Sequence, residues 1–409
     1  MSGAEAAGAR ACPACGGALG PTFYETGEVP VHSCLMLADA DAAMRFPAGT
    51  VRLAQCAACG FVTNTDFDAV WSACSPDYED QQSFSPTFNS FAGRLAQDLV
   101  ARHGLQGKRV VEVGCSKGDF MALLCEAGAA EATGIDPSVL PGRVPAPARG
   151  RMRMIAEYYG PEHLDLPADM ICHRHTLEHI QDISGHLALL HEHARRNPGS
   201  VVFVEVPCAQ RVFEEAAFED IYYEHASYFT PGSLARALRR AGFGVARLWR
   251  DYHDQYLLAE ARPDGAADRR FAIEADPAAE HALTARFRET VGRTIAAWRD
   301  FVQAETARGR RIAVWGSGSK CVAFLHALGD AAAAIDAIVD INPHRAGRHA
   351  PRIPLPVSPP EALPRRTPDV IVVMNAAYED EIRRQCADLG LRPDIACLGR
   401  APADMLSRI

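Results

Sequence analysis

Three features are missing from this 409-residue sequence, and each absence excludes a class of protein. No apolar run approaches the roughly 20 residues that a membrane-spanning helix needs, so we expect no membrane contact. Basic residues are not in excess, because the net charge is −9; a dedicated nucleic-acid binder normally carries a basic face, so no nucleic acid is expected as a partner. The opening residues, MSGAEAAGARACPAC, lack the basic start and apolar stretch of a secretory signal. A cytoplasmic location is therefore expected.

The chain also lacks a repeat of fixed period, and its length allows two or three domains. Composition and pattern divide it into four segments, of which the second and fourth alternate strands with helices and predict an α/β protein. The segments are a Cys-, Gly- and Pro-rich lobe (1–68), a core (69–262), a helical linker (263–309) and a second α/β unit (310–409). Core strands are expected at 109–114, 131–136, 151–156, 169–174, 201–207 and 256–261.

Of the thirteen cysteines, four form two CxxC pairs, CPAC and CAAC. In a reducing compartment such pairs are metal ligands more often than disulfides. Four thiolates complete a tetrahedral, structural zinc site, which predicts zinc on Cys12, Cys15, Cys56 and Cys59. The alternatives are a coincidental pairing, a zinc ribbon that binds nucleic acid, or substitution of one ligand by His32 or Cys34 from the intervening stretch.

The first core strand runs into the turn EVGCSKGDF, which contains Glu112, Gly114 and Gly118, and the next strand ends at Asp136. Glycines let a backbone approach a ligand closely, and a carboxylate some 20 residues further on can bind ribose hydroxyls. The spacing resembles the ExGxxxG signature of class I S-adenosylmethionine (SAM)-dependent methyltransferases. That resemblance implies a SAM site which also includes Cys115 and Pro137; a generic Rossmann-like turn that binds another ligand is the alternative.

The segment HTLEHI follows the fourth core strand and contains His175, Glu178 and His179. By itself it matches the HxxEH zinc pattern of inverted-motif metalloproteases. Its position after that strand instead resembles the methyltransferase pattern, in which the first positions line the cofactor and the last histidine faces the substrate. This interpretation places His175 at the cofactor and His179 at the acceptor, with a capping or core histidine as the alternative for His179.

Another polar cluster, DIYYEHASYFT at 220–230, contains Tyr222, Tyr223, Glu224 and His225. A carboxylate beside an imidazole does not suit a dry core. The cluster follows the strand 201–207, and ligands of doubly wound sheets bind beyond the carboxyl ends of the strands. We therefore expect it to border the acceptor pocket, although a solvated edge covered by tyrosines is the simpler alternative.

Together the paired-cysteine lobe, the methyltransferase core, the YxEH segment and the C-terminal Rossmann-like unit resemble the three-part C-methyltransferases that act on nucleotide-linked keto-deoxysugars in antibiotic pathways. The resemblance covers nearly the whole chain. It implies catalytic roles for Tyr222, Glu224, His225 and His179, and an acceptor-binding role for the C-terminal unit. The implied acceptor contacts there are Lys320, Asn375 and Tyr378.

Two segments depart from the family. The turn DYHDQYLLAEA, with His253 and Gln255, replaces a Gly-Gly-Ser turn, and YEDQQSFSP, with Tyr78 and Gln82, is not the expected Ser-rich lid. Both would touch acceptor or cofactor, so a related branch that methylates another small metabolite, on oxygen or nitrogen, is a second hypothesis. A non-catalytic cofactor-binding protein is a third. The C-terminal turn WGSGSKC is a weak NAD signal, and a purely scaffolding role for its unit is equally open.

The methyl group of SAM is already electrophilic, so the protein must present a nucleophile and remove a proton. For carbon methylation beside a ketone, His225 is our predicted base, because neutral imidazole titrates near physiological pH. Glu224 would orient it, while Tyr222 and His179 would stabilise the enolate oxygen and Tyr223 would contact the acceptor. The sequence is compatible with a monomer or a homodimer.

Overall fold

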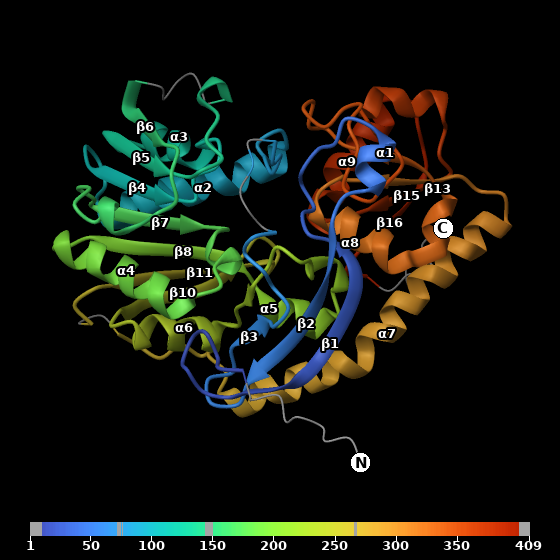
Figure 1. The fold of residues 1–409 in the computed structure, drawn as a ribbon. Coiled ribbons are helices and arrows are strands. Elements are labelled where there is room, and N and C mark those ends of the chain that lie inside the picture. The colour runs from blue at the N-terminus through green and yellow to red at the C-terminus, as the bar shows by residue number, and fades with distance from the viewer. Residues whose placement is uncertain (1–9, 72–74, 76, 144–149, 266–267, 401–409) are drawn as a thin grey trace, which may run out of the picture.

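The computed structural model describes residues 10–71, 75, 77–143, 150–265 and 268–400. The expected ends of the first and last segments, 1–9 and 401–409, lie outside the described residues. The described chain contains three sheets of four, seven and five strands. In Figure 1 the seven-stranded sheet and the five-stranded sheet form two separate bodies, and the long blue strands of the first sheet lie between them.

The N-terminal sheet is antiparallel and has the strand order β1-β2-β3-β9. Its last strand comes from the core, because Val62 and Thr63 pair with Tyr228 and Ser227. The segment that carries Glu224 and His225 is therefore anchored to the N-terminal lobe by backbone hydrogen bonds. The elements are β1 (Leu19–Pro30), α1 (Ala40–Met44), β2 (Ala48–Cys56), β3 (Val62–Asn64) and β9 (Ser227–Tyr228).

The central sheet has the order β10-β11-β8-β7-β4-β5-β6. Five strands are parallel, and β11 and β10 complete one edge in antiparallel register. The six strands expected from the sequence are all present, and β10 is an additional one. The strands are β4 (Arg109–Val113), β5 (Glu131–Ile135), β6 (Met152–Ile155), β7 (Met170–Arg174), β8 (Val201–Pro207), β10 (Gly244–Asp251) and β11 (Tyr256–Arg262). The helices are α2 (Pro86–His103), α3 (Asp119–Glu126), α4 (Ile183–Arg196), α5 (Ala209–Glu215) and α6 (Pro231–Arg240).

The central strands of this sheet could be predicted from the sequence because they are buried on both faces. Strand β8 is almost wholly apolar and buried along its length, as expected for a parallel strand covered on both faces. The exception is Glu205, fully buried, whose carboxylate is paired with Arg174 at 2.8 Å. The order and directions of the strands confirm the Rossmann-like α/β core expected from the sequence.

The C-terminal sheet is parallel throughout, with the order β14-β13-β12-β15-β16. It is the second Rossmann-like unit expected from the pattern. Its elements are β12 (Ile312–Trp315), α8 (Ser319–Leu328), β13 (Ile335–Val339), β14 (Val357–Ser358), β15 (Val370–Val373), α9 (Glu379–Asp388) and β16 (Asp394–Cys397).

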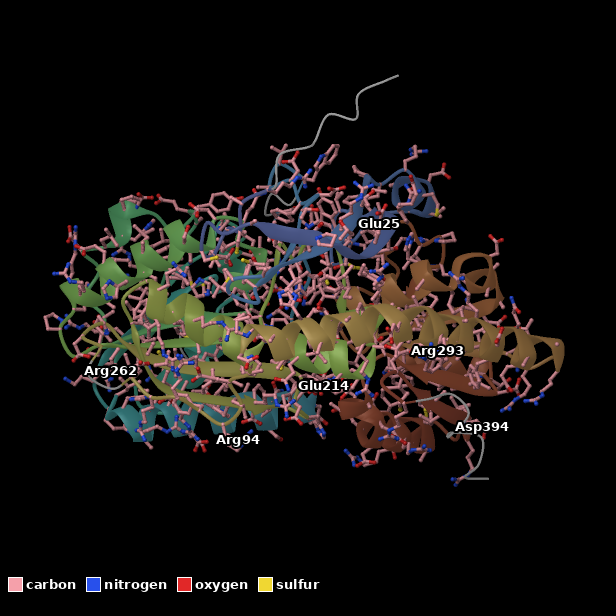
Figure 2. The ribbon with its side chains drawn as sticks, turned by 90° about the horizontal axis from the view of Figure 1, so that it is seen from below. Glu25, Arg94, Glu214, Arg262, Arg293 and Asp394 are labelled. Carbon is pink, nitrogen blue, oxygen red and sulfur yellow. The ribbon has the colours of Figure 1, made fainter. Side chains whose placement is uncertain are left out.

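Helix α7 (Pro277–Ala307) begins with Asp276 as its N-cap, whose side chain accepts the N–H of Ala279 at 2.8 Å. It does more than connect two units. Phe287 and Trp298 are buried in one apolar cluster that also takes in residues of β1, α5 and β12. Figure 2 shows the helix from below, with Arg293 labelled on it, crossing from the core to the C-terminal unit.

Among the described residues no helix is long and apolar enough to cross a membrane.

Candidate active site

A cavity of about 420 Å³ lies where the core, the N-terminal lobe and the C-terminal unit meet. Its walls come from the N-terminal lobe at Cys34, the segment 78–88, the turn after β4, the turn after β7, the segment after β8, the turn before β11, and the C-terminal loops. The sequence-predicted residues on its walls are Tyr78, Gln82, Glu112, Gly114, Cys115, His175, His179, Tyr222, His225, Gln255, Lys320, Asn375 and Tyr378. The structure therefore brings together most of the predicted cofactor, catalytic and acceptor residues.

The turn after β4 has the backbone that a SAM site requires. Gly114 and Gly118 have φ values of 73° and 84°, a region that favours glycine, and a Cβ on Gly114 would overlap the Thr176 side chain. Glu112 lines the cavity at 3% exposure, and burial raises its pKa to about 8. Gly118, Asp136 and Pro137 lie behind this wall and do not line the cavity.

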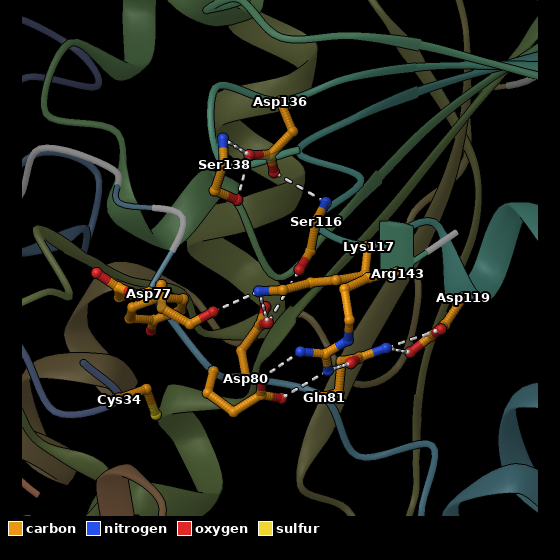
Figure 3. Close-up of polar contacts among 12 residues, drawn as sticks. Cys34, Asp77, Asp80, Gln81, Ser116, Lys117, Asp119, Asp136, Ser138 and Arg143 are labelled. Atoms are coloured by element: carbon orange, nitrogen blue, oxygen red, sulfur yellow. Dashed lines mark hydrogen bonds and ion pairs between the residues drawn. The ribbon is translucent and has the colours of Figure 1, made fainter. Parts of the chain in front are cut away.

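The Asp136 carboxylate closes the turn from behind. It accepts the backbone N–H of Ser116 at 2.9 Å and that of Ser138 at 2.7 Å (Figure 3). It holds the position of the acidic residue after the second strand of such folds, but it acts on the turn rather than on the cavity. The glycine backbone of the turn, which lines the cavity with Glu112 and Cys115, fits a bound SAM.

Segment 78–85 covers the turn, and its polar contacts were missed by sequence reasoning. The buried Lys117 ammonium donates to the Asp80 carboxylate at 2.9 Å (Figure 3). It also donates to the Tyr78 carbonyl. Asp80 also accepts the Ser116 hydroxyl at 2.9 Å. Gln81 bridges to Asp119 at 2.8 Å. Lys117 is part of the EVGCSKGDF turn, but nothing in that stretch of sequence indicated that it would pair with Asp80.

At the other end of the cavity, three rings meet. The His225 ring centroid lies 5.1 Å from that of His179 and 4.2 Å from that of Tyr222. Burial, together with the nearby His179 and His175, holds the pKa of His225 well below its usual value, so the ring is neutral at physiological pH. Burial and neighbouring carboxylates raise the pKa of the Tyr222 phenol. A neutral imidazole and a protonated phenol thus face the same space.

The Glu224 carboxylate does not orient the His225 ring, which is the role that its adjacent position in the sequence suggested. Its carboxylate turns away from the cavity and contacts His32 Nδ1 at 3.1 Å, the Ser33 N–H at 3.0 Å and the Ser33 hydroxyl. Burial would raise the pKa of Glu224, but these contacts outweigh it and hold the pKa below the usual range. The Glu224 carbonyl lies 3.0 Å from His179 Nδ1.

Two further predicted residues lie outside the cavity. Tyr223 stacks on Phe67 at 5.9 Å, and its hydroxyl accepts the N–H of Asp68 at 3.0 Å within the N-terminal lobe. His253 is exposed, in the turn between β10 and β11, with a φ of 57°. Their positions do not support the predicted acceptor contacts.

In the turn after β7, the His175 ring pairs with two buried carboxylates. His175 has a φ of 45°, and its ring lies 2.8 Å from Glu205 and 3.4 Å from Glu178. Burial lowers the pKa of His175, but the two carboxylates outweigh it and raise the pKa to about 9, so this ring is cationic at neutral pH. The ring edge packs on Tyr256 at 4.5 Å. His175 therefore lines the site as a fixed positive charge.

The C-terminal unit closes the cavity through paired polar groups. Lys320 contacts the Asp220 carboxylate at 2.5 Å, and Asp220 also accepts from Arg211 at 2.9 Å. Gln255 and Asn375 exchange two amide hydrogen bonds of 2.9 Å each. Arg211 and Asp220 line the wall but were not predicted, since each pairs with a partner that only the fold supplies.

The four predicted metal ligands lie together at the edge of the N-terminal sheet. The Sγ atoms of Cys12 and Cys59 are 3.7 Å apart, those of Cys15 and Cys56 are 3.5 Å apart, and all four fall within 4.8 Å of one another. A tetrahedron with zinc–sulfur bonds of about 2.3 Å has edges of about 3.8 Å. The donor set and its spacing therefore fit a zinc ion.

Two family models match the chain in sequence. One, described as a methyltransferase domain, matches residues 88–248, and the other, described as a C-methyltransferase C-terminal domain, matches residues 262–392. The chain is similar to the C-methyltransferase NovU of Streptomyces niveus, with 28% identity over 304 residues that cover 71% of each chain.

Solved structures are similar to part of the chain. An S-adenosylmethionine-dependent methyltransferase from Mesorhizobium loti is 17% identical with a TM-score of 0.30, covering 42% of this chain and 99% of its own. The magnesium protoporphyrin IX methyltransferase from Synechocystis PCC 6803 with bound SAH is 17% identical with a TM-score of 0.34, covering 45% of this chain and 90% of its own.

The turn after β4, the two matching family models and the similarity to a curated C-methyltransferase agree that the chain is a SAM-dependent methyltransferase, and that it is similar to C-methyltransferases.

Proposed function

We propose that this enzyme methylates the carbon next to the ketone of a nucleotide-linked keto-deoxysugar, in natural-product biosynthesis, with His225 as the base. The observation that carries the proposal is the position of the neutral His225 ring on the wall of a cavity that also contains the SAM turn. SAM supplies an electrophilic methyl group when it is bound. What remains for the chain is to hold the acceptor and to take its proton.

His225 takes the proton from the acceptor carbon, and the C–H electron pair becomes an enolate. The Tyr222 phenol, next to the His225 ring, donates a hydrogen bond to the oxygen on which negative charge develops. His179 packs against the other histidine ring and donates its Nδ1–H to the Glu224 carbonyl at 3.0 Å, so it helps to position this segment at the acceptor. Bound SAM would supply its methyl group to the enolate carbon, and the electron pair of the sulfur–methyl bond would leave on sulfur as the neutral thioether. The proton then leaves His225 for solvent.

The acceptor would lie between the core and the C-terminal unit. Lys320, Asn375 and Tyr378 line the cavity on that side and support a role in holding the nucleotide portion. Lys320 is already paired with Asp220, so a phosphate would compete with this carboxylate for the ammonium.

Zinc on the four cysteines would stabilise the N-terminal lobe and would take no part in the reaction. Arg236 of α6 donates from Nε to the Cys59 carbonyl at 2.9 Å and pairs with Glu280 of α7, so the cysteine cluster is attached to one helix of the core and to the linker helix. We assign zinc a structural role in the reducing cytoplasm.

The test uses solvent deuterium. The enzyme is incubated with SAM and a panel of nucleoside-diphosphate-linked keto-deoxysugars in deuterated water, with uridine diphosphate glucose as the ketone-free control. The proposal predicts deuterium at the acidic carbon with wild-type enzyme and loss of both exchange and methylation in His225→Asn. Methylation of an oxygen or nitrogen, without exchange, would replace it with the second hypothesis, in which the same histidine deprotonates a heteroatom.

A further inference from the structure

The carboxylate that serves the base is not the one next to it in sequence. Glu224 is committed to His32 and Ser33, and Ser33 continues to Ser319 with a hydroxyl distance of 2.6 Å. This chain of contacts leaves no carboxylate oxygen of Glu224 facing His225. A buried histidine that must become cationic during the reaction needs another anion nearby, because an isolated buried charge is costly.

Glu178 is a buried carboxylate near His225. It lies in the 3₁₀ turn Leu177–His179 after β7, is 2% exposed, and lines the cavity. Its Oε1 lies 3.4 Å from His175 Nδ1. Its Oε2 is buried and has no hydrogen-bond partner among the described residues. A buried carboxylate oxygen without a partner at the wall of an active-site cavity requires an explanation.

The distances between Glu178, His179 and His225 supply an explanation for this unpartnered oxygen. A carboxylate oxygen of Glu178 and ring nitrogens of His179 and His225 all lie within 4.8 Å of one another. Two hydrogen bonds of about 2.8 Å that meet at a tetrahedral angle span about 4.6 Å, so a single water or acceptor oxygen can connect the carboxylate to the imidazole.

We propose that Glu178 is the positioning carboxylate of the base, which fixes the ring proton of His225 through one bridging oxygen and offsets the charge of the imidazolium that forms. This inference rests on the proposed function. When the C–H bond of the acceptor breaks, its proton joins the free nitrogen of His225 and its electron pair stays on carbon. The second nitrogen keeps its proton, directed toward Glu178. After methyl transfer the imidazolium returns the extra proton to solvent.

The surroundings of His225 agree with this role. The titratable groups facing it are Glu178, His179 and His175 from the turn after β7, and Tyr222 and Tyr228 from its own segment. Two of them are histidines that disfavour a second positive charge, and His175 is itself cationic. Glu178 contacts His175, and one of its oxygens lies within 4.8 Å of a ring nitrogen of His225, so it is an anion near both rings.

The test compares Glu178→Gln, which removes the charge and keeps the shape, with Glu178→Asp and with Glu192→Gln. Glu192 lies on α4, pairs with Arg195 at the surface and is remote from the cavity. We expect Glu178→Gln to lower kcat by at least about 10-fold, with the acceptor KM changed less than about threefold. Glu178→Asp should recover part of the rate, and the acidic limb of the kcat/KM profile should move in Glu178→Gln but not in Glu192→Gln.

A second readout needs no acceptor. With ¹⁵N-labelled histidine, and with the His225→Asn spectrum for assignment, wild-type His225 should show one fixed tautomer, and Glu178→Gln should show a mixture of two. Melting temperature and SAM affinity check that Glu178→Gln folds.

The outcomes separate cleanly. If His225→Asn keeps full activity, the proposed function itself fails. If His225→Asn is inactive while Glu178→Gln matches Glu192→Gln in rate, pH profile and tautomer, only the role of Glu178 is overturned. A second metal ion per chain, beyond zinc, that Glu178→Gln loses would also overturn it, because Glu178 would then be a metal ligand.

Discussion

Glu224 and His32, 192 positions apart, form a buried pair in which Oε1 and Nδ1 are 3.1 Å apart. The pair attaches the segment that carries His225 to the N-terminal lobe. Together with the backbone pairing of β3 and β9, it makes the lobe part of the active-site framework.

The Glu224–His32 pair should therefore be measurable as a coupling. Glu224→Gln and His32→Gln should each lower the free energy of unfolding by about 1–3 kcal/mol, since each leaves a buried partner unsatisfied. The double variant should lose less than the sum of the two, by at least about 0.5 kcal/mol, in urea unfolding. Strict additivity would mean that the two side chains do not interact.

Tyr222 and Tyr223 are neighbours with opposite surroundings, so their phenylalanine variants should differ. Tyr223→Phe loses the hydrogen bond from the Asp68 N–H in the lobe and should cost about 1 kcal/mol of stability with little effect on methyl transfer. Tyr222→Phe, on the cavity wall, should lower the methylation rate with little effect on stability. Melting curves and rates for both variants check this; a Tyr223→Phe enzyme with a large rate loss would contradict it.

Lys117 should support SAM binding indirectly, by holding segment 78–85 over the turn. Lys117→Met removes the ammonium bound to Asp80 and the Tyr78 carbonyl, and a charged hydrogen bond contributes about 1.5–3 kcal/mol. We expect the Kd for SAM to rise by roughly 10-fold or more in titration calorimetry. Lys108→Met, at the surface, is the matched control and should bind SAM as wild type does.

A feature could be predicted from the sequence when a short stretch of chain determines it, and could not when it depends on a contact between distant residues. Strands such as β4 and β8 were predictable because their apolar runs are bounded by turns, and Gly114 because a ligand turn needs its backbone. Strand β10 escaped notice because its outward arginines interrupt the apolar pattern. The partner of Glu224 could not be predicted, since 192 residues separate it from His32 and adjacency to His225 suggested another contact.

The same reason explains the acceptor side of the site. Lys320 was read as a phosphate contact from its loop, but its pairing with Asp220 arises only when the C-terminal unit docks on the core. Glu178 was visible in HTLEHI beside two histidines, and only the fold shows which ring its carboxylate reaches.

Zinc removal should destabilise the N-terminal lobe. Cys56→Ser breaks the tetrahedral donor set, so we expect the purified variant to lose its zinc and to melt at a lower temperature. Cys125→Ala, a buried thiol outside the cluster, should keep its zinc. Metal analysis of both proteins checks this, and a wild-type protein that holds no zinc after preparation without chelators would contradict it.

Acid should destabilise the fold through a pair of histidines behind the central sheet. His173 Nε2 and His186 Nε2 lie 2.8 Å apart, so one ring must accept the proton that the other donates. Burial holds the pKa of His173 well below its usual value and lowers that of His186 to about 4. Because the unfolded chain binds these protons near pH 6.5, the stabilisation is complete above that pH and is lost as the pH falls toward 4.

Urea unfolding between pH 7.5 and 4.5 measures this loss, which for His186 alone should be about 1–2 kcal/mol by pH 5. His186→Asn removes the titrating ring, so its stability should fall less steeply across the same interval. His191→Asn, on the same helix and bonded at 3.0 Å to the Pro263 carbonyl, should keep the wild-type slope. Equal slopes in all three proteins would show that the acid sensitivity arises elsewhere, for example at other buried histidines whose pKa is lowered, such as His193 and His225.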